Sequence, residues 1–288
     1  MRYPKFLQEN GTIGFVAPSF GCNIEPYKTA FDNSLTKFRG LGHKLELGPN
    51  CYEGSGIGIS NTPQACGKEL TEYYCSVDND VLLSVGGGEL MCETISYVDF
   101  EAIKAAEPKW FMGYSDNTNF TFLLTTLCDT AAIYGPCAQT FGMEPWDKSL
   151  HDTYELLCGR NKQISGYEFW EKDSLKNKEH PLVPYNLTEE RNIRGFLPTT
   201  PIGKEAEEDS NWISFWGKEM PETEVQFEGR FVGGCIDCLV NLLGTKYDDV
   251  KGFQERYKED GIIWFIESCE LNVMAIRRAI WQIGRAHV

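Results

Sequence analysis

Four short strand-like runs, spaced so that helices fit between them, constrain the fold of this chain more than any other feature. Each run is followed closely by a Gly, Pro or Ser that favours a turn. The runs are Thr12–Pro18, Lys44–Leu47, Val81–Val85 and Trp110–Met112. Helix-like segments at Tyr27–Arg39, closed by Gly40, and at Pro63–Cys75 separate the first three runs. Strands that alternate with helices predict an α/β fold with a parallel sheet covered on both faces.

The chain changes character after about residue 159. Lys, Asn, Glu and Pro dominate as far as residue 190, with little periodicity, which indicates a linker or a surface excursion. A second αβ unit follows, with Gln226–Val232 extended, Ile236–Leu243 helical and Gly261–Ile266 a buried strand. The length of 288 residues also exceeds the ~100–200 usual for one domain. We predict an N-terminal domain over residues 1–160, a linker or specificity segment over 161–190, and a smaller C-terminal α/β domain over 191–282.

Charge and hydropathy narrow the class of partner. The formal charge is −15, from 42 acidic and 27 basic residues, without a Lys/Arg cluster. Such a surface argues against nucleic acid or an anionic membrane as partner, so a peptide or another small molecule is expected. A homodimer is compatible with the sequence. No secretory h-region and no run of ~20 apolar residues is present, so we expect a cytoplasmic protein.

Eleven cysteines are scattered without a disulfide-framework spacing, and we expect most of them to be reduced and buried. The pair Cys235 and Cys238 has the spacing of a redox motif or of half a zinc site. No second pair at zinc spacing exists. Because both residues fall in a helix expected after Gly233 and Gly234, buried packing is the favoured interpretation. We therefore expect no metal.

The stretch Lys109–Thr118 carries the clearest chemical signal. It places Ser115 between the run at Trp110–Met112 and a helix-compatible segment at Phe120–Leu127. A serine on a sharp strand-to-helix turn presents its hydroxyl at the sheet edge, beside helix N–H groups that can hold an oxyanion. Ser and Asp are also favoured helix caps, so a purely capping role for Ser115 and Asp116 stays open.

Two further features could complete a site. Gly86, Gly87 and Gly88 follow the third strand, where absent side chains let a main-chain N–H approach a ligand, although such a triplet also marks ordinary turns. Glu267 follows the strand at Gly261–Ile266, at the sheet edge where ligands commonly bind, and could orient a histidine. A solvated loop acid is the alternative, and Glu270 competes for the same role.

Taken together, these motifs resemble the LD-carboxypeptidase family, which includes muramoyltetrapeptide carboxypeptidases and peptidases of microcin C self-immunity. The resemblance spans nearly the whole chain. It is carried by Ile13–Ser19, the glycine run, Gly113–Asp116, Tyr134–Pro136, Gly233–Gly234, Leu243–Thr245 and Phe265–Glu267. It implies an N-terminal three-layer α/β domain and a smaller C-terminal α/β domain, with the active site between them.

The resemblance also implies roles for individual residues. Ser115 would be the nucleophile of a Ser–His–Glu triad and Glu267 the acid that orients the histidine. The N–H groups of Asp116 and of Gly87 or Gly88 would form the oxyanion hole. This scheme requires neither a metal nor an organic cofactor.

The histidine departs from the family pattern. In the family it follows the glutamate by several elements, usually in a Gly-His pair, whereas this chain holds only His43, His151, His180 and His287. None of the four matches that position. Residues 283–288 read as the translation of a sequencing-library adapter, so we expect a non-native tail, a C-terminal domain that is incomplete, and a chain that is inactive as given.

Three functions remain open from the sequence. The first is a serine-type LD-carboxypeptidase that cleaves an amide next to a D-amino acid, with cytoplasmic murein tetrapeptide of peptidoglycan recycling as its substrate. The second is a microcin-immunity-like peptidase acting on aminoacyl-nucleotide amides, in which Trp170 could stack on a base. The third is a catalytically silent binding protein that keeps the cleft.

Overall fold

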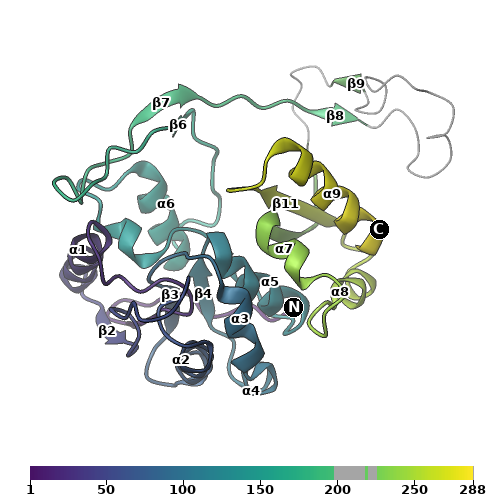
Figure 1. Ribbon diagram of the computed structural model, residues 1–288. Coiled ribbons are helices and arrows are strands. Elements are labelled where there is room, and N and C mark those ends of the chain that lie inside the picture. Colours follow the sequence, from purple (N-terminus) through teal and green to yellow (C-terminus); the bar gives the residue numbers. More distant parts are fainter. Residues whose placement is uncertain (198–217, 220–225, 288) are drawn as a thin grey trace, which may run out of the picture.

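The computed structural model describes residues 1–197, 218–219 and 226–287 of the chain (Figure 1). Parts of the predicted C-terminal domain, residues 198–217 and 220–225, therefore lie outside the described residues. The strands are β1 (Thr12–Val16), β2 (Lys44–Leu47), β3 (Val81–Ser84), β4 (Trp110–Gly113), β5 (Ile133–Tyr134), β6 (Phe169–Glu171), β7 (Leu187–Glu190), β8 (Phe196–Leu197), β9 (Lys218–Glu219), β10 (Arg230–Cys235) and β11 (Ile262–Glu267).

The α-helices are α1 (Tyr27–Gly40), α2 (Pro63–Cys75), α3 (Met91–Thr94), α4 (Phe100–Ala105), α5 (Thr118–Thr126), α6 (Lys148–Leu157), α7 (Ile236–Leu242), α8 (Val250–Arg256) and α9 (Val273–His287). Short 3-10 helices η1 (Ile95–Tyr97), η2 (Ser115–Asn117) and η3 (Ala138–Gly142) connect some of them.

The N-terminal half is built on a five-stranded sheet in the order β2-β1-β3-β4-β5. All of its neighbouring strands are parallel, and Ile13 in β1 lies opposite Leu45 in β2 and Val81 in β3. The four predicted strands are therefore confirmed. The edge strand β5 adds only Ile133 and Tyr134, which is too short for a periodic signal in the sequence.

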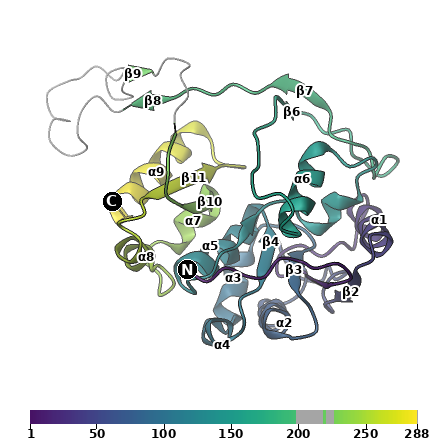
Figure 2. The same cartoon turned by 180° about the vertical axis from the view of Figure 1, so that it is seen from behind.

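Helices cover both faces of this sheet, as Figures 1 and 2 show from opposite sides. Phe31 and Phe38 of α1 and Leu150 of α6 pack against one set of strand side chains. Leu70 of α2 and Phe120 of α5 pack with the alternate set on the other face. The side chains of a strand alternate between faces, so strands buried on both sides give the predicted three-layer architecture.

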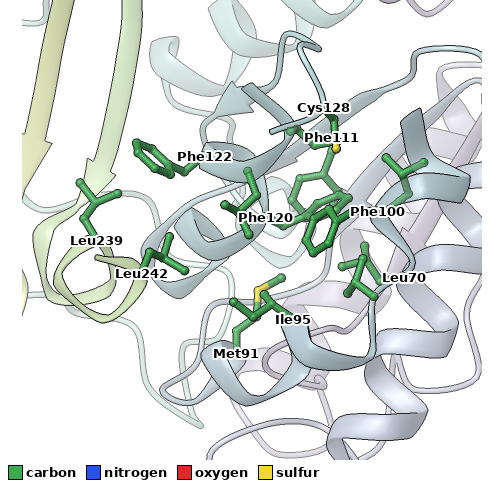
Figure 3. Packing of buried hydrophobic residues seen from close by; sticks show 14 of the residues in the cluster. Leu70, Met91, Ile95, Phe100, Phe111, Phe120, Phe122, Cys128, Leu239 and Leu242 are labelled. Carbon is green, nitrogen blue, oxygen red and sulfur yellow. The ribbon is translucent and has the colours of Figure 1, made fainter. Parts of the chain in front are cut away.

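Phe120 sits at the centre of the core on the α5 side (Figure 3). Its ring meets Phe111 of β4 edge-on at 4.8 Å and Tyr74 of α2 at 5.7 Å between centroids. The same cluster continues into the C-terminal unit through Leu239 and Leu242 of α7. One hydrophobic core thus joins the two units and fixes how they face each other.

The C-terminal unit contains the parallel pair β10 and β11, with α7, α8 and α9 packed beside it. Gly233 and Gly234 in β10 have φ values of 151° and 139°. A Cβ atom on Gly233 would lie 1.7 Å from the Phe265 carbonyl oxygen, and one on Gly234 would lie 2.6 Å from Thr118 Oγ1. The glycine pair therefore lets β10 approach both β11 and the start of α5.

Residues 159–190, predicted as a linker or surface excursion, form a mostly exposed arm that contains two short strands. Within it β6 and β7 pair antiparallel, with Phe169 opposite Glu190. Figure 1 shows β6 and β7 above α6, and the chain after β7 running over the molecule to β8 on the side of α9. Trp170 in β6 is 50% exposed.

All eleven cysteines are free thiols, and seven of them are buried, including Cys235 and Cys238. Among the described residues, no group of three or more His, Cys, Asp or Glu side chains is arranged to hold a metal ion. The zinc interpretation of the pair therefore has no support here. In the part of the chain that the structure describes, no helix is long and apolar enough to cross a membrane.

Candidate active site

Ser115 stands on a sharp turn between β4 and α5. The backbone is extended at Tyr114, turns left-handed at Ser115 with φ 61°, and then enters η2 and α5. This confirms the predicted strand–turn–helix junction. The capping interpretation does not fit, because Asn117 is the N-cap of α5 and no side-chain cap bond is made there.

The turn of Ser115 is held by two hydroxyl groups. The Ser115 N–H donates to the Tyr134 hydroxyl at 3.0 Å, and Thr118 Oγ1 donates to the Ser115 carbonyl at 2.7 Å. A left-handed conformation costs a non-glycine residue about 1–2 kcal/mol. Surrounding contacts must offset that cost, and strain of this kind is concentrated at functional sites.

The glycine run, Gly86–Gly88, packs directly against the turn at Ser115. A Cβ atom on Gly87 would lie 2.9 Å from Ser115 Cβ and 3.3 Å from its Oγ, so only glycine leaves room there. The Gly88 N–H donates to Asp116 Oδ1 at 2.8 Å and is therefore already occupied. Of the two glycines expected to serve the oxyanion hole, the geometry thus favours Gly87 and disfavours Gly88.

Asp116 is 2% exposed, and its carboxylate accepts every hydrogen bond that it makes in the described structure. Burial raises the pKa of Asp116 to about 6, although hydrogen bonds from Ser19 and from the Gly88 and Met91 N–H groups oppose this shift. Within the described residues, the main-chain N–H groups of Asp116 and Gly87 donate to no protein acceptor. Both remain able to bind an oxyanion.

Glu267 ends β11 and lies within reach of the same turn. Its Oε1 accepts the Tyr134 hydroxyl proton at 2.5 Å, a short bond of the charge-assisted kind. Burial and the Glu267 carboxylate raise the pKa of the Tyr134 hydroxyl, which keeps it a donor. Glu270, the competing candidate, instead faces Glu89, and partial burial together with the Glu270 carboxylate raises the pKa of Glu89.

The histidines lie elsewhere. His43 precedes β2 at the opposite edge of the sheet, where its ring contacts the Gly11 carbonyl and the Tyr154 hydroxyl. His151 packs against Trp146, and His180 lies exposed in the arm. Among the described side chains, no histidine bonds Ser115 or Glu267. The side chain of His287 lies outside the described residues.

Sequence reasoning missed the part played by three side chains. Tyr134 links Ser115 to Glu267, Thr118 braces the turn and also accepts the Cys235 N–H at 2.9 Å, and Ser19 contacts Asp116 at 2.6 Å. A weak signal existed for Tyr134, which stands just before Gly135 and Pro136 at the end of a short apolar run. Thr118 and Ser19 stand at the ends of the motifs Lys109–Thr118 and Ile13–Ser19, but neither of them was predicted from the sequence to have a role of its own.

Two sequence models of one family match the chain. The model of the LD-carboxypeptidase N-terminal domain matches residues 13–135, and the model of its C-terminal domain matches residues 228–288. The chain belongs to the LD-carboxypeptidase family. Membership places it among serine peptidases of this type, and the matched N-terminal segment contains both the glycine run and Ser115. None of the curated proteins matches this sequence.

Solved structures support the same LD-carboxypeptidase fold. MccF in complex with glutamyl sulfamoyl guanosine is 21% identical with a TM-score of 0.74, over 98% of this chain and 75% of that one. An MccF-like protein from Bacillus anthracis str. Ames is 19% identical with a TM-score of 0.71, over 100% and 78%. An MccF-like protein from Streptococcus pneumoniae in complex with AMP is 20% identical with a TM-score of 0.69, over 96% and 78%. At these identities the likeness concerns the fold.

Proposed function

We propose that Ser115 is the nucleophile of a serine-type LD-carboxypeptidase that hydrolyses an amide next to a D-amino acid. Cytoplasmic murein tetrapeptide, the substrate of a peptidoglycan-recycling step, is the proposed substrate. The observation that carries this proposal is the left-handed turn at Ser115, pressed against Gly87 so closely that a Cβ atom would not fit.

The chemistry follows from that geometry. Ser115 Oγ attacks the amide carbonyl, and the negative charge of the tetrahedral intermediate falls between the free N–H groups of Asp116 and Gly87. A base returns the proton of the Ser115 hydroxyl to the amide nitrogen as the intermediate collapses, so that the C–N bond breaks, the terminal D-amino acid leaves as an amine and an acyl group remains on Ser115. Water then cleaves this ester and restores the hydroxyl.

Both attacks need a base, first to take the proton of the Ser115 hydroxyl and later that of the attacking water. Glu267 is the proposed orienting acid, as in a Ser–His–Glu triad, with its carboxylate held near the turn by Tyr134. None of the described histidine side chains bonds this pair. An alcohol without a general base is a poor nucleophile at neutral pH, so we propose that the chain as given is nearly inactive.

A second candidate is a peptidase of the MccF kind, acting on an aminoacyl-nucleotide amide. Trp170 favours it, because this half-exposed ring on the β6–β7 arm could stack on a nucleobase. Both candidates use the same nucleophile and the same oxyanion hole. They differ only in the substrate, which is a peptide ending in a D-amino acid in the first case and an aminoacyl-nucleotide in the second.

Free imidazole can stand in for the base and so allows the chain to be tested as it is. The purified protein is incubated with murein tetrapeptide, and separately with an aspartyl-sulfamoyl nucleotide, with and without imidazole, and products are followed by mass spectrometry. We expect slow, imidazole-dependent release of D-alanine that Ser115→Ala abolishes. Faster turnover of the nucleotide amide would favour the second candidate. Binding of either compound without any Ser115-dependent turnover would indicate a silent binding protein.

A further inference from the structure

We propose that the Asp116 side chain is a positioning residue that sets the glycine run so that the Gly87 N–H faces Ser115. This inference rests on the proposed function, because it concerns the same oxyanion hole. It assigns the side chain of Asp116 a task separate from that of its main-chain N–H. One residue would then supply one oxyanion donor and place the other.

The contacts of the carboxylate tie three loops together. Oδ1 accepts the Gly88 N–H at 2.8 Å, and Oδ2 accepts the Met91 N–H at 3.3 Å, so the middle of the loop between β3 and α3 and the start of α3 are fixed. The Ser19 hydroxyl, in the loop after β1, lies 2.6 Å from both oxygens. Asp116 itself belongs to the turn that carries Ser115. The carboxylate therefore fixes the glycine run relative to that turn.

The glycine run has little freedom once this carboxylate is in place. A Cβ atom on Gly88 would lie 2.5 Å from Ser19 Oγ, which shows how closely the loop after β1 packs on the run. On its other side the Gly86 carbonyl accepts Asn117 Nδ2 at 3.1 Å. Gly87 is thus clamped between two anchored neighbours, with its own N–H left without a protein acceptor in the described structure.

A carboxylate suits this task better than an amide. All of its partners are donors, and bonds from N–H and O–H groups to a charged acceptor are stronger than bonds between neutral groups. The substitution Asp116→Asn would keep one acceptor for Gly88 but would turn an NH₂ group towards the remaining donors. Asp116→Asn should therefore disturb the glycine run less than Asp116→Ala does.

Glu69 provides a matched control. Its carboxylate is also 2% exposed and also accepts two main-chain N–H groups, those of Ala17 at 2.9 Å and Asn50 at 2.8 Å. These bonds fix Ala17 and Asn50, and no residue of the glycine run donates to Glu69 in the described structure. Glu69→Gln therefore reports the general cost of losing a buried carboxylate, without the proposed effect on Gly87.

The first measurement is hydrogen exchange of the glycine amides, followed by NMR on protein labelled with ¹⁵N-glycine. In the unmodified chain we expect slow exchange at Gly88 and faster exchange at Gly87. Asp116→Ala should accelerate Gly88 exchange about 10-fold or more, since a bond to a charged acceptor is lost. Asp116→Asn should give a smaller change, and Glu69→Gln should leave Gly88 unchanged. Unaltered Gly88 protection in folded Asp116→Ala would overturn the inference.

The second measurement is the rate at which an alkyl fluorophosphonate labels Ser115 in the presence of imidazole. The Ser115 Oγ–P bond forms, the P–F bond breaks, fluoride leaves, and imidazole takes the serine proton. Asp116→Ala should slow labelling about 10-fold or more, an effect approaching the loss of an oxyanion donor, whereas Glu69→Gln should not. Equal labelling rates in Asp116→Ala and the unmodified chain would also contradict the inference. A chain that is never labelled at Ser115 would instead defeat the proposed function, while the exchange experiment still tests the placement of the glycine run.

Discussion

The Tyr134 hydroxyl donates to Glu267 Oε1 while it accepts the Ser115 N–H, so one side chain joins the Ser115 turn to the C-terminal unit. Tyr134 and Glu267 are separated by 133 positions in the chain. Their contact links the edge strand β5 to the end of β11. It brings Glu267 to the proposed active site without a histidine between them.

This contact predicts a measurable coupling between Tyr134 and Glu267. Tyr134→Phe and Glu267→Gln should each lower the free energy of unfolding, and the double-mutant cycle should give a coupling of about 0.5–1.5 kcal/mol in urea denaturation. The exposed position of Glu267 keeps the expected value at the lower end. Strictly additive effects would mean that the two side chains do not interact in solution.

The left-handed backbone at Ser115 predicts that a side chain at this position lowers the free energy of unfolding. Ser115→Gly removes the steric conflict at φ 61°, whereas Ser115→Ala keeps it. We expect the glycine variant to be about 1 kcal/mol more stable than the alanine variant in urea denaturation. Asn10 has φ 59° and is a control, because Asn tolerates this region. Asn10→Gly should raise the free energy of unfolding, relative to the unmodified chain, by less than the difference between Ser115→Gly and Ser115→Ala. An alanine variant as stable as the glycine variant would argue against a strained turn.

The close approach of Gly87 predicts that a single methyl group there disables the site. Gly87→Ala places a Cβ atom 2.9 Å from Ser115 Cβ, so the turn or the glycine run must move. Fluorophosphonate labelling of Ser115 should slow by up to roughly 100-fold, as when one oxyanion donor is lost. Gly40→Ala is the control, since a Cβ atom there meets nothing within 4 Å. Normal labelling of Gly87→Ala would remove Gly87 from the oxyanion hole.

The raised pKa of Glu69 predicts that the free energy of unfolding falls as pH rises. Burial raises the pKa of Glu69 from 4.5 to about 7, against the opposing hydrogen bonds from Asn50 and Ala17. Between these values the folded state binds more protons than the unfolded state, so its stability falls as pH rises through that window. The full effect is on the order of 3 kcal/mol. Asp116 acts in the same direction at lower pH.

The measurement is urea denaturation at pH 5.5 and at pH 8. The chain should be more stable at pH 5.5, and Glu69→Gln should reduce the difference. Glu72→Gln, on an exposed position of the same helix, should keep the full difference. A stability that rises from pH 5.5 to pH 8 in the unmodified chain would contradict the assignment to Glu69.

Much of the fold could be predicted because it depends on local patterns. The runs that became β1, β3 and β4 are apolar and end at residues that favour turns, and α2 begins at Pro63, a common first helical residue. The strand β5 could not be predicted, since two residues carry no period. The pairing of β6 with β7 was missed because polar residues dominate the arm and its strands, Phe169–Glu171 and Leu187–Glu190, show no alternation of apolar and polar residues.

In the candidate site, too, local features could be predicted from the sequence and long-range contacts could not. Ser115 could be found from its place between a strand and a helix, a local feature. The sequence could not show which glycine N–H is free, because this depends on the contacts of the Asp116 carboxylate. One of its partners, Ser19, is 97 positions away in the chain. The bridging role of Tyr134 likewise depends on how the two units dock, which a single sequence does not encode in any local pattern.

The central claim is that Ser115 is a nucleophile facing an oxyanion hole, and covalent labelling tests it most directly. The unmodified chain is treated with an alkyl fluorophosphonate in the presence of imidazole, digested, and mapped by mass spectrometry. The account predicts one modified residue, Ser115, with labelling that depends on imidazole and is absent in Ser115→Ala. Labelling at other residues alone, or equal labelling of Ser115→Ala, would contradict it.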